Sequence, residues 1–187
     1  MLALNGQVVA PRIEWLNTKW NPKTQGQEWC KLINEMTRDE GRNAIIVDRI
    51  VQAVNEGRQV LVLSDRVEHC QTLANDLADY NLKSAAFVGS VSKKRRQQIL
   101  EEANAREIDV ICATTVADEG LDLPGLDTVM LTTPSKALNR VQQRIGRVMR
   151  PHPDKKEPKV IDLVDEPGSL RGIARKRLRL YTRLGCR

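Results

Sequence analysis

Short runs of apolar residues recur along the second part of this chain, and each is followed by a segment with helical periodicity. A continuous apolar run of this length is typical of a strand that is buried on both faces of a sheet. Strands that alternate with helices through short loops indicate a doubly wound α/β fold with a mostly parallel sheet. The predicted strands are Val60–Leu63, Ala85–Val88, Val110–Ala113, Val129–Leu131 and Val160–Val164.

Two helices are predicted before the first of these strands. Residues 28–37 carry apolar side chains at i, i+3, i+4 and i+7, which is the spacing of a buried helix face. We expect Gly41 to break this helix and a second helix to run from about Ala44 to Asn55, with Gly57 just beyond its end. Asp65 is the candidate cap of the helix that follows the first strand.

The positive charge is concentrated at the C-terminus. The chain of 187 residues has a net charge of +6, and residues 168–187 contain seven basic residues and no acidic one. The first 167 residues therefore carry about −1. A local basic excess favours a polyanionic partner, and the 3% aromatic content favours phosphate contacts over base stacking. A basic helix is predicted at 169–184, with Leu178 among its buried residues. Its basic face is expected either to contact DNA or dock on another domain, or only to make the surface soluble.

Cysteine and histidine usage excludes two classes of small protein. The four cysteines form no C-x-x-C pair and the chain has only two histidines, so neither a zinc site nor a disulfide framework is expected. Cys70 and Cys112 lie in apolar contexts and are predicted to be core residues. No signal peptide and no apolar run near 18 residues is present, which predicts a soluble intracellular protein.

Small and hydroxyl-bearing residues follow the predicted strands. Because crossovers in parallel sheets are right-handed, the loops after the strands open at one edge, where ligands bind. Hydroxyl and backbone N–H groups at that edge suit phosphate oxygens, although strand ends favour small residues in any case. The residues concerned are Ser64, Gly89–Ser90, Thr114–Thr115, Thr132–Thr133 and Asp165.

One predicted helix, Ala137–Arg150, carries the octet QRIGRVMR at its end. On a helix Gln143, Arg147 and Arg150 fall at i, i+4 and i+7 and share one face, and Gly146 removes bulk beside them. Two aligned guanidinium groups hold a polyphosphate better than two lysines do. The alternative for the octet alone is a solvated basic helix.

Four segments in order resemble the motifs of superfamily 2 helicases. Val110–Pro124 (VICATTVADEGLDLP) resembles motif V, and Gln143–Arg150 resembles motif VI. Val60–Cys70 resembles motif IV, and Ala86–Arg96 resembles the element that follows it. The resemblance covers about residues 41–165 and is closest to DNA helicases of the bacterial and phage type, since motif VI opens with Gln143 where DEAD-box proteins usually have His.

The resemblance implies two RecA-like domains, with ATP and Mg²⁺ in the cleft between them and nucleic acid across the top. All matched motifs belong to the C-terminal domain, a three-layer αβα sandwich expected over residues 41–187, with residues 1–40 as a lead-in segment and helix packed on it. The sequence contains no G-x-x-x-x-G-K-S/T phosphate loop. The chain is therefore expected to bind no Mg²⁺ itself and not to hydrolyse ATP alone.

The expected partners are the missing N-terminal RecA-like domain and DNA, single-stranded or branched, with RNA as an alternative. The expected compartment is the cytoplasm of a bacterium or of a phage-infected host. Two other classes of protein make different predictions for the sequence. A non-catalytic nucleic-acid-binding module would not use paired arginine fingers, and a dinucleotide-binding enzyme needs a G-x-G-x-x-G loop, which is absent.

The resemblance assigns the nucleotide contacts. Arg147 and Arg150 resemble the arginine fingers, which stabilise charge on the γ-phosphate in the transition state. Gln143 is expected to contact the same phosphate. Gly120 and Asp122 resemble the motif V pair that reaches the nucleotide, with Asp122 accepting from the ribose or, alternatively, capping a turn.

The resemblance also assigns a nucleic-acid path. Thr114 resembles the phosphate-binding threonine of motif V, and Ser64 and Gly89 are similar candidates. Lys93 and Lys94 open a run of four cations in the first turn of a helix, where they oppose the helix macrodipole. Either a DNA backbone or plain solvation compensates them.

Overall fold

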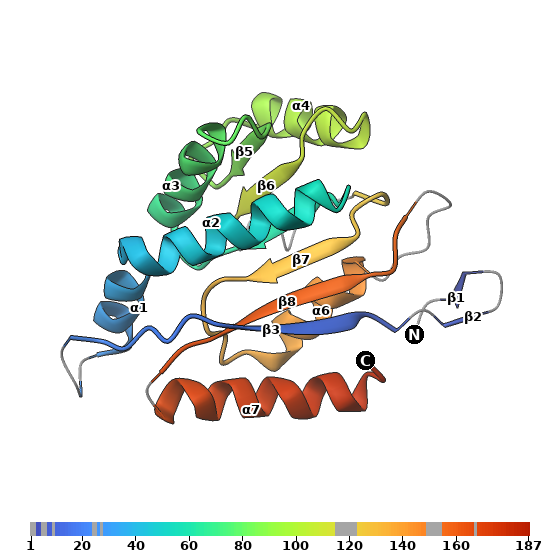
Figure 1. Cartoon of the computed structure of the whole chain (residues 1–187). Coiled ribbons are helices and arrows are strands. Elements are labelled where there is room, and N and C mark those ends of the chain that lie inside the picture. The colour runs from blue at the N-terminus through green and yellow to red at the C-terminus, as the bar shows by residue number, and fades with distance from the viewer. Residues whose placement is uncertain are drawn as a thin grey trace.

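A computed structural model of the chain describes residues 3–4, 7–8, 10–23, 26, 28–114, 123–148, 155–166 and 168–187. Strands and helices alternate along it (Figure 1). The strands are β1 (Ala3–Leu4), β2 (Gln7–Val8), β3 (Arg12–Asn17), β4 (Val60–Leu63), β5 (Ser84–Phe87), β6 (Val110–Ala113), β7 (Thr128–Leu131) and β8 (Lys159–Val164). The helices are α1 (Trp29–Thr37), α2 (Glu40–Asn55), α3 (Val67–Ala78), α4 (Lys93–Asn104), α6 (Leu138–Val148) and α7 (Gly168–Arg183).

Six strands form one sheet in the order β3-β8-β7-β4-β6-β5. Every neighbouring pair is parallel, which confirms the predicted α/β class. Every residue of β4 and β6 is buried, including Cys112, and Cys70 is buried as well, as their apolar contexts predict. These central strands carry apolar side chains on both faces because helices cover both faces.

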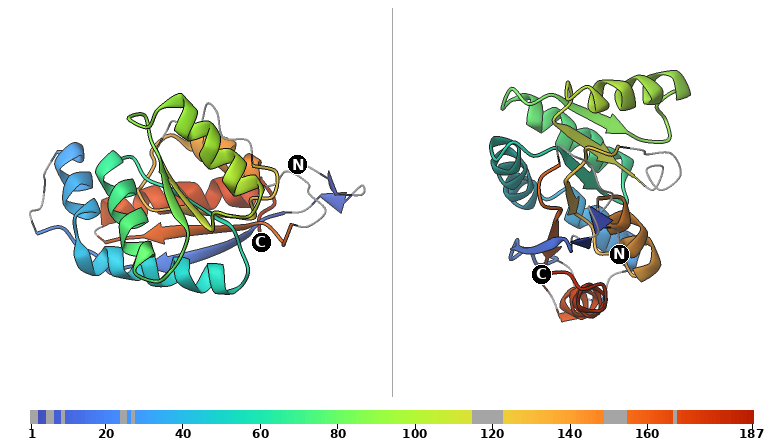
Figure 2. Two further views of the ribbon diagram at one scale, coloured as in Figure 1. Left: turned by 90° about the horizontal axis from the view of Figure 1, so that it is seen from above. Right: turned by 90° about the vertical axis from the view of Figure 1, so that its right-hand side faces the viewer.

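The sheet lies between two helical layers, as Figure 2 shows. Helices α2 and α3 pack on one face, around Ile50 and Leu73. Helices α4, α6 and α7 pack on the other face, around Ile99, Val141 and Leu180. Helix α1 builds a smaller cluster with Trp20 and the start of α7. The three-layer αβα sandwich that the helicase resemblance implies is confirmed.

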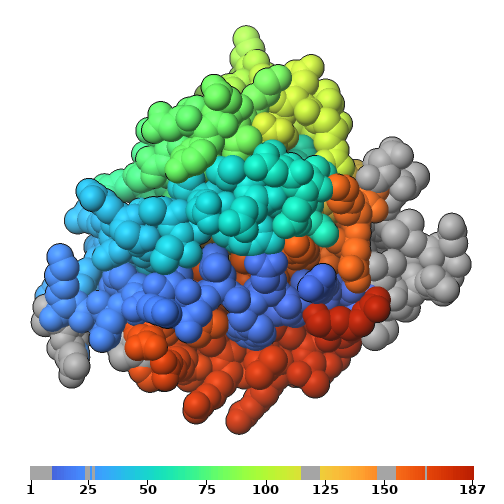
Figure 3. All heavy atoms as spheres, viewed as in Figure 1, coloured from blue at the N-terminus to red at the C-terminus, as the bar shows by residue number. Residues whose placement is uncertain are grey.

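The N-terminal segment contributes a strand to the sheet and does not only pack on the domain. Strand β3 pairs with β8 over its whole length and forms one edge of the sheet. Figure 3 shows this segment in blue between α2 and α7. Arg187 donates its backbone N–H to Pro11 (3.0 Å) and accepts from Ile13 (2.6 Å), so the C-terminus closes against the same strand. The expected division at residue 41 therefore runs through one continuous sheet.

Two predicted helix boundaries are wrong. Helix α2 begins at Glu40, and Asp39 caps it by accepting from the backbone N–H of Arg42 at 2.8 Å. Helix α1 ends at Thr37, as predicted, but Gly41 does not separate the two helices because it lies inside α2. Asp65 does not cap α3, whose N-cap residue is Arg66 with no side-chain capping bond. Gly57 lies just beyond the end of α2, as predicted, and adopts the left-handed conformation with φ +73°.

The face of α7 that packs on the sheet differs from the prediction. Leu178 is 48% exposed, whereas Arg177 is 2% exposed. Arg177 donates two hydrogen bonds to Asp162, both at 2.7 Å, and the hydroxyl of Tyr181 donates to the same carboxylate at 2.5 Å. Burial raises the pKa of the Asp162 carboxyl, against the opposing effect of Arg177. The prediction that Leu178 is buried is wrong because the ion pair between Arg177 and Asp162 determines which face of α7 packs on the sheet.

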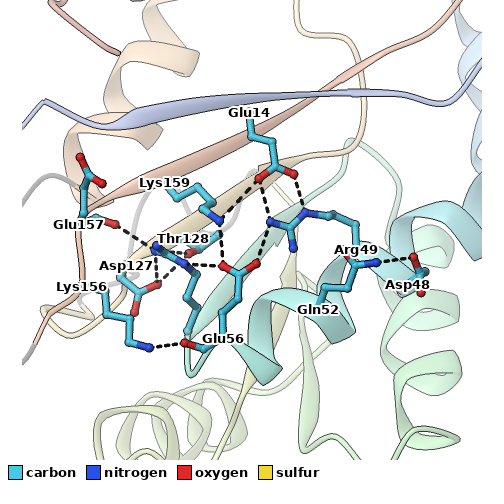
Figure 4. A network of polar contacts seen from close by, with 11 residues as sticks. Glu14, Asp48, Arg49, Gln52, Glu56, Asp127, Thr128, Lys156, Glu157 and Lys159 are labelled. Carbon is cyan, nitrogen blue, oxygen red and sulfur yellow. Dashed lines mark hydrogen bonds and ion pairs between the residues drawn. The ribbon is translucent and has the colours of Figure 1, made fainter.

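A second polar network joins the amino-terminal ends of the strands (Figure 4). Arg49 of α2 donates to Glu14 of β3 at 2.5 and 2.8 Å and to Glu56 at 3.3 Å. Lys159, the first residue of β8, donates to Glu56 at 2.9 Å. Arg58, just before β4, lies 3.5 Å from Asp127, just before β7. The network ties α2 to the edge of the sheet opposite the one at which ligands are expected.

Candidate functional site

The carboxyl-terminal ends of the six parallel strands meet at one edge of the sheet. The small and hydroxyl-bearing residues predicted there occupy this edge where the structure describes them, but most of the described side chains point inward, and Thr115 lies outside the described residues. Ser64 is 1% exposed, Thr132 is fully buried and Asp165 is 3% exposed. The Thr132 hydroxyl donates to the carbonyl of Leu63 at 2.7 Å. These hydroxyl groups therefore hold neighbouring strand ends together, and only part of the edge is open to a ligand.

A buried ion pair occupies the β8 end of this edge. Arg42 of α2 donates to both oxygens of Asp165, at 2.8 and 3.1 Å, and to the carbonyl of Thr132 at 2.5 Å. Thr18, which follows β3, donates its hydroxyl to Asp165 at 2.5 Å. The group links α2 to the ends of β3, β8 and β7. It fixes the starting point of the loop that leads from β7 to α6.

Ser64 belongs to a second buried group and does not reach the surface. His69 of α3 lies 2.9 Å from the Ser64 hydroxyl through Nδ1 and 3.0 Å from the Asn43 carbonyl oxygen through Nε2. Ser64 also accepts from the backbone N–H of Arg66 at 3.2 Å. The prediction that the Ser64 hydroxyl contacts a nucleic-acid phosphate is therefore not supported by its position. Its polar atoms are occupied in ordering the turn after β4.

The hydrogen bonds of Asn43 determine the tautomer of His69. The amide nitrogen of Asn43 donates to the carbonyl of Thr37 at 3.1 Å, so its amide oxygen faces His69 and accepts. Nε2 of His69 therefore carries the proton, and Nδ1 accepts from the Ser64 hydroxyl. Burial, together with the charge of Arg42, lowers the pKa of His69 to about 3. The imidazole is neutral at physiological pH.

Several of the other predicted residues lie near one another at the ends of β5 and β6. The ends of β6 and β5 are adjacent, which places Thr114 beside the turn that contains Gly89. Thr114 is 7% exposed, whereas Gly89 is open to solvent. Lys93 and Lys94 begin α4 and are exposed, and Ser92 caps the helix by accepting from the backbone N–H of Arg95 at 3.2 Å. Gly89, Lys93 and Lys94 thus form one exposed basic corner of the sheet.

Helix α6 begins a few residues after β7 and has two distinct sides. Val141, Arg144 and Ile145 are buried against the sheet, and Gln143 is exposed. Arg144 therefore belongs to the side of the helix that packs on the sheet. Gly146 is partly exposed, and within the described part of the chain a Cβ atom built on it would have no heavy atom within 4 Å apart from its neighbours and the backbone of its own helix. Gln143 and the open space at Gly146 define an outward-facing surface on α6.

Several predicted contacts lie outside the described residues. Residue 147 is part of the α6 backbone, but its side chain is not described, and Arg150 lies beyond the described end of the helix. Gly120 and Asp122 lie in the undescribed interval between β6 and β7. The roles of these four residues remain predictions from the sequence.

Cavity volume and metal-ligand clusters do not mark the predicted site. A groove of about 890 Å³ lies between α2 and α3, and none of the predicted site residues lines it. Within the described ranges, no group of three or more His, Cys, Asp or Glu residues is placed to hold a metal ion. No helix in the same ranges is long and apolar enough to cross a membrane.

Comparison with known proteins identifies the family. Residues 35–152 match the family described as helicase conserved C-terminal domain. The protein named helicase 22 of Sulfolobus islandicus filamentous virus is 29% identical over 154 residues, which are 82% of this chain and 27% of the viral protein. The pre-mRNA-splicing ATP-dependent RNA helicase PRP28 of Lodderomyces elongisporus is 29% identical over 96 residues, 51% of this chain and 16% of that protein. The chain thus spans about a quarter or less of these curated relatives.

Solved structures show the same fold. The helicase domain of Pyrococcus furiosus Hef aligns with a TM-score of 0.54 and 27% identity, over 76% of this chain and 28% of that one. The Escherichia coli DEAD-box protein SrmB aligns with a TM-score of 0.65 and 19% identity, over 89% of this chain and 85% of that one. The match to the family covers α2 to α6, the region that contains the resemblance to motifs IV, V and VI. The chain therefore belongs to the helicase conserved C-terminal domain family, as the C-terminal RecA-like domain of a superfamily 2 helicase.

Proposed function

We propose that the chain is the C-terminal half of an ATP-dependent superfamily 2 DNA helicase or translocase. In this proposal it supplies arginine fingers and part of the nucleic-acid path to an N-terminal RecA-like domain. The observation that supports it most is the orientation of α6. Arg144 is buried and Gln143 is exposed, and residue 147 lies one helical turn beyond Gln143.

ATP would be held by the N-terminal domain together with Mg²⁺, and its hydrolysis would supply the free energy for movement. Arg147 and Arg150 would stabilise the charge that develops on the γ-phosphate, with Gln143 contacting the same group. Gly120 and Asp122 would reach the nucleotide from the motif V segment. Of these residues, Gln143 is the one whose side chain is described, and its exposure is what a contact across a domain cleft requires.

The nucleic-acid path would run along the exposed basic corner. Gly89 offers a backbone N–H group without a side chain in the way, and Lys93 and Lys94 project from the first turn of α4. Neither lysine has an ion pair within the described part of the chain. Thr114 lies behind this corner and is nearly buried, so its contact would be made largely through backbone groups.

The proposed activity is tested by ATP turnover with a separately produced N-terminal RecA-like domain and single-stranded DNA. The chain alone is expected to be silent, the N-terminal domain alone weak, and the mixture active. Turnover by this chain alone would contradict the proposal, because it would require a phosphate-binding loop that the sequence lacks. A mixture that stays silent while this chain binds DNA would favour a non-catalytic binding module.

The choice between DNA and RNA needs a separate experiment. Gln143 at the start of motif VI favours DNA by resemblance, whereas PRP28 is named an RNA helicase. We expect a DNA oligonucleotide to stimulate turnover of the mixture more than an RNA oligonucleotide of the same sequence and length. A stronger response to RNA would reverse this part of the proposal and leave the rest unchanged.

A further inference from the structure

The outer face of α7 carries cations that the fold does not use. The side chains of Arg175, Lys176, Arg179 and Arg183 are exposed, and none of these side chains has a hydrogen bond or ion pair within the described ranges. Arg177 differs because it is buried in its pair with Asp162. The inner face of α7 therefore holds the helix on the sheet, and packing does not account for the cations on the outer face.

These cations act against the stability of their own helix. Arg175, Arg179 and Arg183 follow one another at i and i+4, and like charges at that spacing repel. No acidic residue lies between positions 168 and 187 to offset them. Lysine would give equal solubility, yet three of the four are arginine, the side chain that binds phosphate through two parallel hydrogen bonds.

Three of the cations border a groove with an apolar floor. The groove has a volume of about 190 Å³ and lies between the start of α6 and the second half of α7. Lys176, Arg179 and Arg183 line it together with Leu138 and Leu180. Positions 176, 179 and 183 stand at i, i+3 and i+7 and so share one helix face. Cations beside an apolar surface match a chain of phosphates that alternate with sugars and bases.

We propose that this α6–α7 groove binds a single strand of nucleic acid and forms a second contact surface outside the predicted path. The proposal rests on the proposed function in that both need a nucleic-acid substrate. From Lys176 to Arg183 the helix rises about 10 Å, which suits two or three consecutive phosphates of one strand. A duplex is too wide to enter so small a groove.

The position of the groove separates it from the predicted path. Helix α7 packs beside β8 and β3, and Lys93 and Lys94 start α4 beside β5, at the other edge of the sheet (Figure 1). Four strand-to-strand steps from β8 to β5 amount to about 19 Å. Leu138 is the first residue of α6, the helix that carries Gln143. A strand in the groove would therefore lie beside the helix expected to contact ATP.

Fluorescence anisotropy with a labelled single-stranded DNA oligonucleotide, read at several salt concentrations, tests the proposal. The chain with Lys176→Ala, Arg179→Ala and Arg183→Ala should bind at least about tenfold more weakly, and its salt slope should fall by about 2, because each lost phosphate contact removes about 0.7. The control with Lys23→Ala, Lys31→Ala and Lys83→Ala removes equal charge from exposed positions elsewhere. It should keep the slope.

Measurements of stability, competition and turnover complete the experiment. Thermal unfolding should show the α7 variant to be at least as stable as the parent, since repulsion between cations is removed. The proposal would be overturned if the control lost as much affinity as the α7 variant, or if the salt slope of the α7 variant were unchanged. It would also be overturned if polyglutamate or duplex DNA competed for binding as well as single-stranded DNA does. Arg147→Ala should leave oligonucleotide binding unchanged while it abolishes turnover of the two-domain mixture. Failure of turnover alone therefore counts against the proposed function and not against the groove.

Discussion

Acidification should destabilise this domain through one side chain, His69. Burial and the charge of Arg42 lower its pKa to about 3 in the folded chain, whereas an unfolded histidine has a pKa of about 6.5. As the pH falls below about 6.5, this histidine becomes protonated in the unfolded chain but stays neutral in the folded chain. Stability therefore falls continuously from about pH 6.5 until the pH approaches the folded pKa.

The size of the effect follows from the two pKa values. At pH 5 the pH is about 1.5 units below the pKa of the unfolded histidine, and each unit corresponds to about 1.4 kcal/mol. The free energy of unfolding should therefore be about 2 kcal/mol smaller at pH 5 than at pH 7.5. The structural reason is that Nδ1 of His69 accepts from Ser64 and Nε2 donates to Asn43. A second proton on the ring would turn the accepting nitrogen into a donor.

Urea unfolding at pH 7.5 and pH 5 measures this difference. In His69→Gln the chain should be less stable at pH 7.5, but the additional loss on acidification should shrink by about 2 kcal/mol. The other histidine offers a matched control, and His152→Gln should retain the full pH dependence. An equal pH dependence in the parent and in His69→Gln would refute the reasoning. So would a His152→Gln variant that removes the dependence.

Three other perturbations have defined outcomes. A Cβ atom at Gly146 or Gly172 meets no heavy atom within 4 Å, so alanine at either should raise the free energy of unfolding by about 0.5–1 kcal/mol. Only Gly146→Ala should also slow turnover with the N-terminal domain. Asp162→Asn leaves its buried arginine partner without a counter-charge, and urea unfolding should show a loss of about 3–5 kcal/mol. The hydrogen bond from Arg49 lowers the pKa of Glu14. Its contribution is complete above the unfolded pKa of about 4.3 and is lost as the pH falls through the lower folded value. Glu14→Gln should therefore flatten the decline in thermal stability between about pH 5 and pH 3.

The sheet was predictable where a strand is buried on both faces. Strands β4 and β6 are continuous apolar runs, and their predicted ends are those observed. Strand β3 is an edge strand in which polar and apolar residues alternate (RIEWLN), and this short pattern is weaker than a continuous apolar run. The start of α2 differs from the prediction because the side chain of Asp39 caps the helix, so that Gly41 lies inside α2 and not between two helices.

The candidate site was predictable in outline but not in its supporting contacts. Gln143 is exposed on α6, the helix on which spacing predicts that it shares a face with positions 147 and 150. The pair between Arg42 and Asp165 joins residues 123 positions apart, and no local pattern reveals such a contact. The hydroxyl of Ser64 looked available because it follows a strand, yet His69, five residues later on α3, uses it as a hydrogen-bond donor. Competition from a buried partner cannot be read from residue type alone.

That α6 completes an ATP site held by another domain is tested most directly by the kinetics of one substitution. With a saturating single strand of DNA and the N-terminal domain, Arg147→Ala should lower kcat by about 10³-fold or more with little change in the KM for ATP. Arg140→Ala, at an exposed position on the same helix, should leave both constants near those of the parent. A turnover in Arg147→Ala equal to that of the parent would contradict the assignment of an arginine finger to this helix.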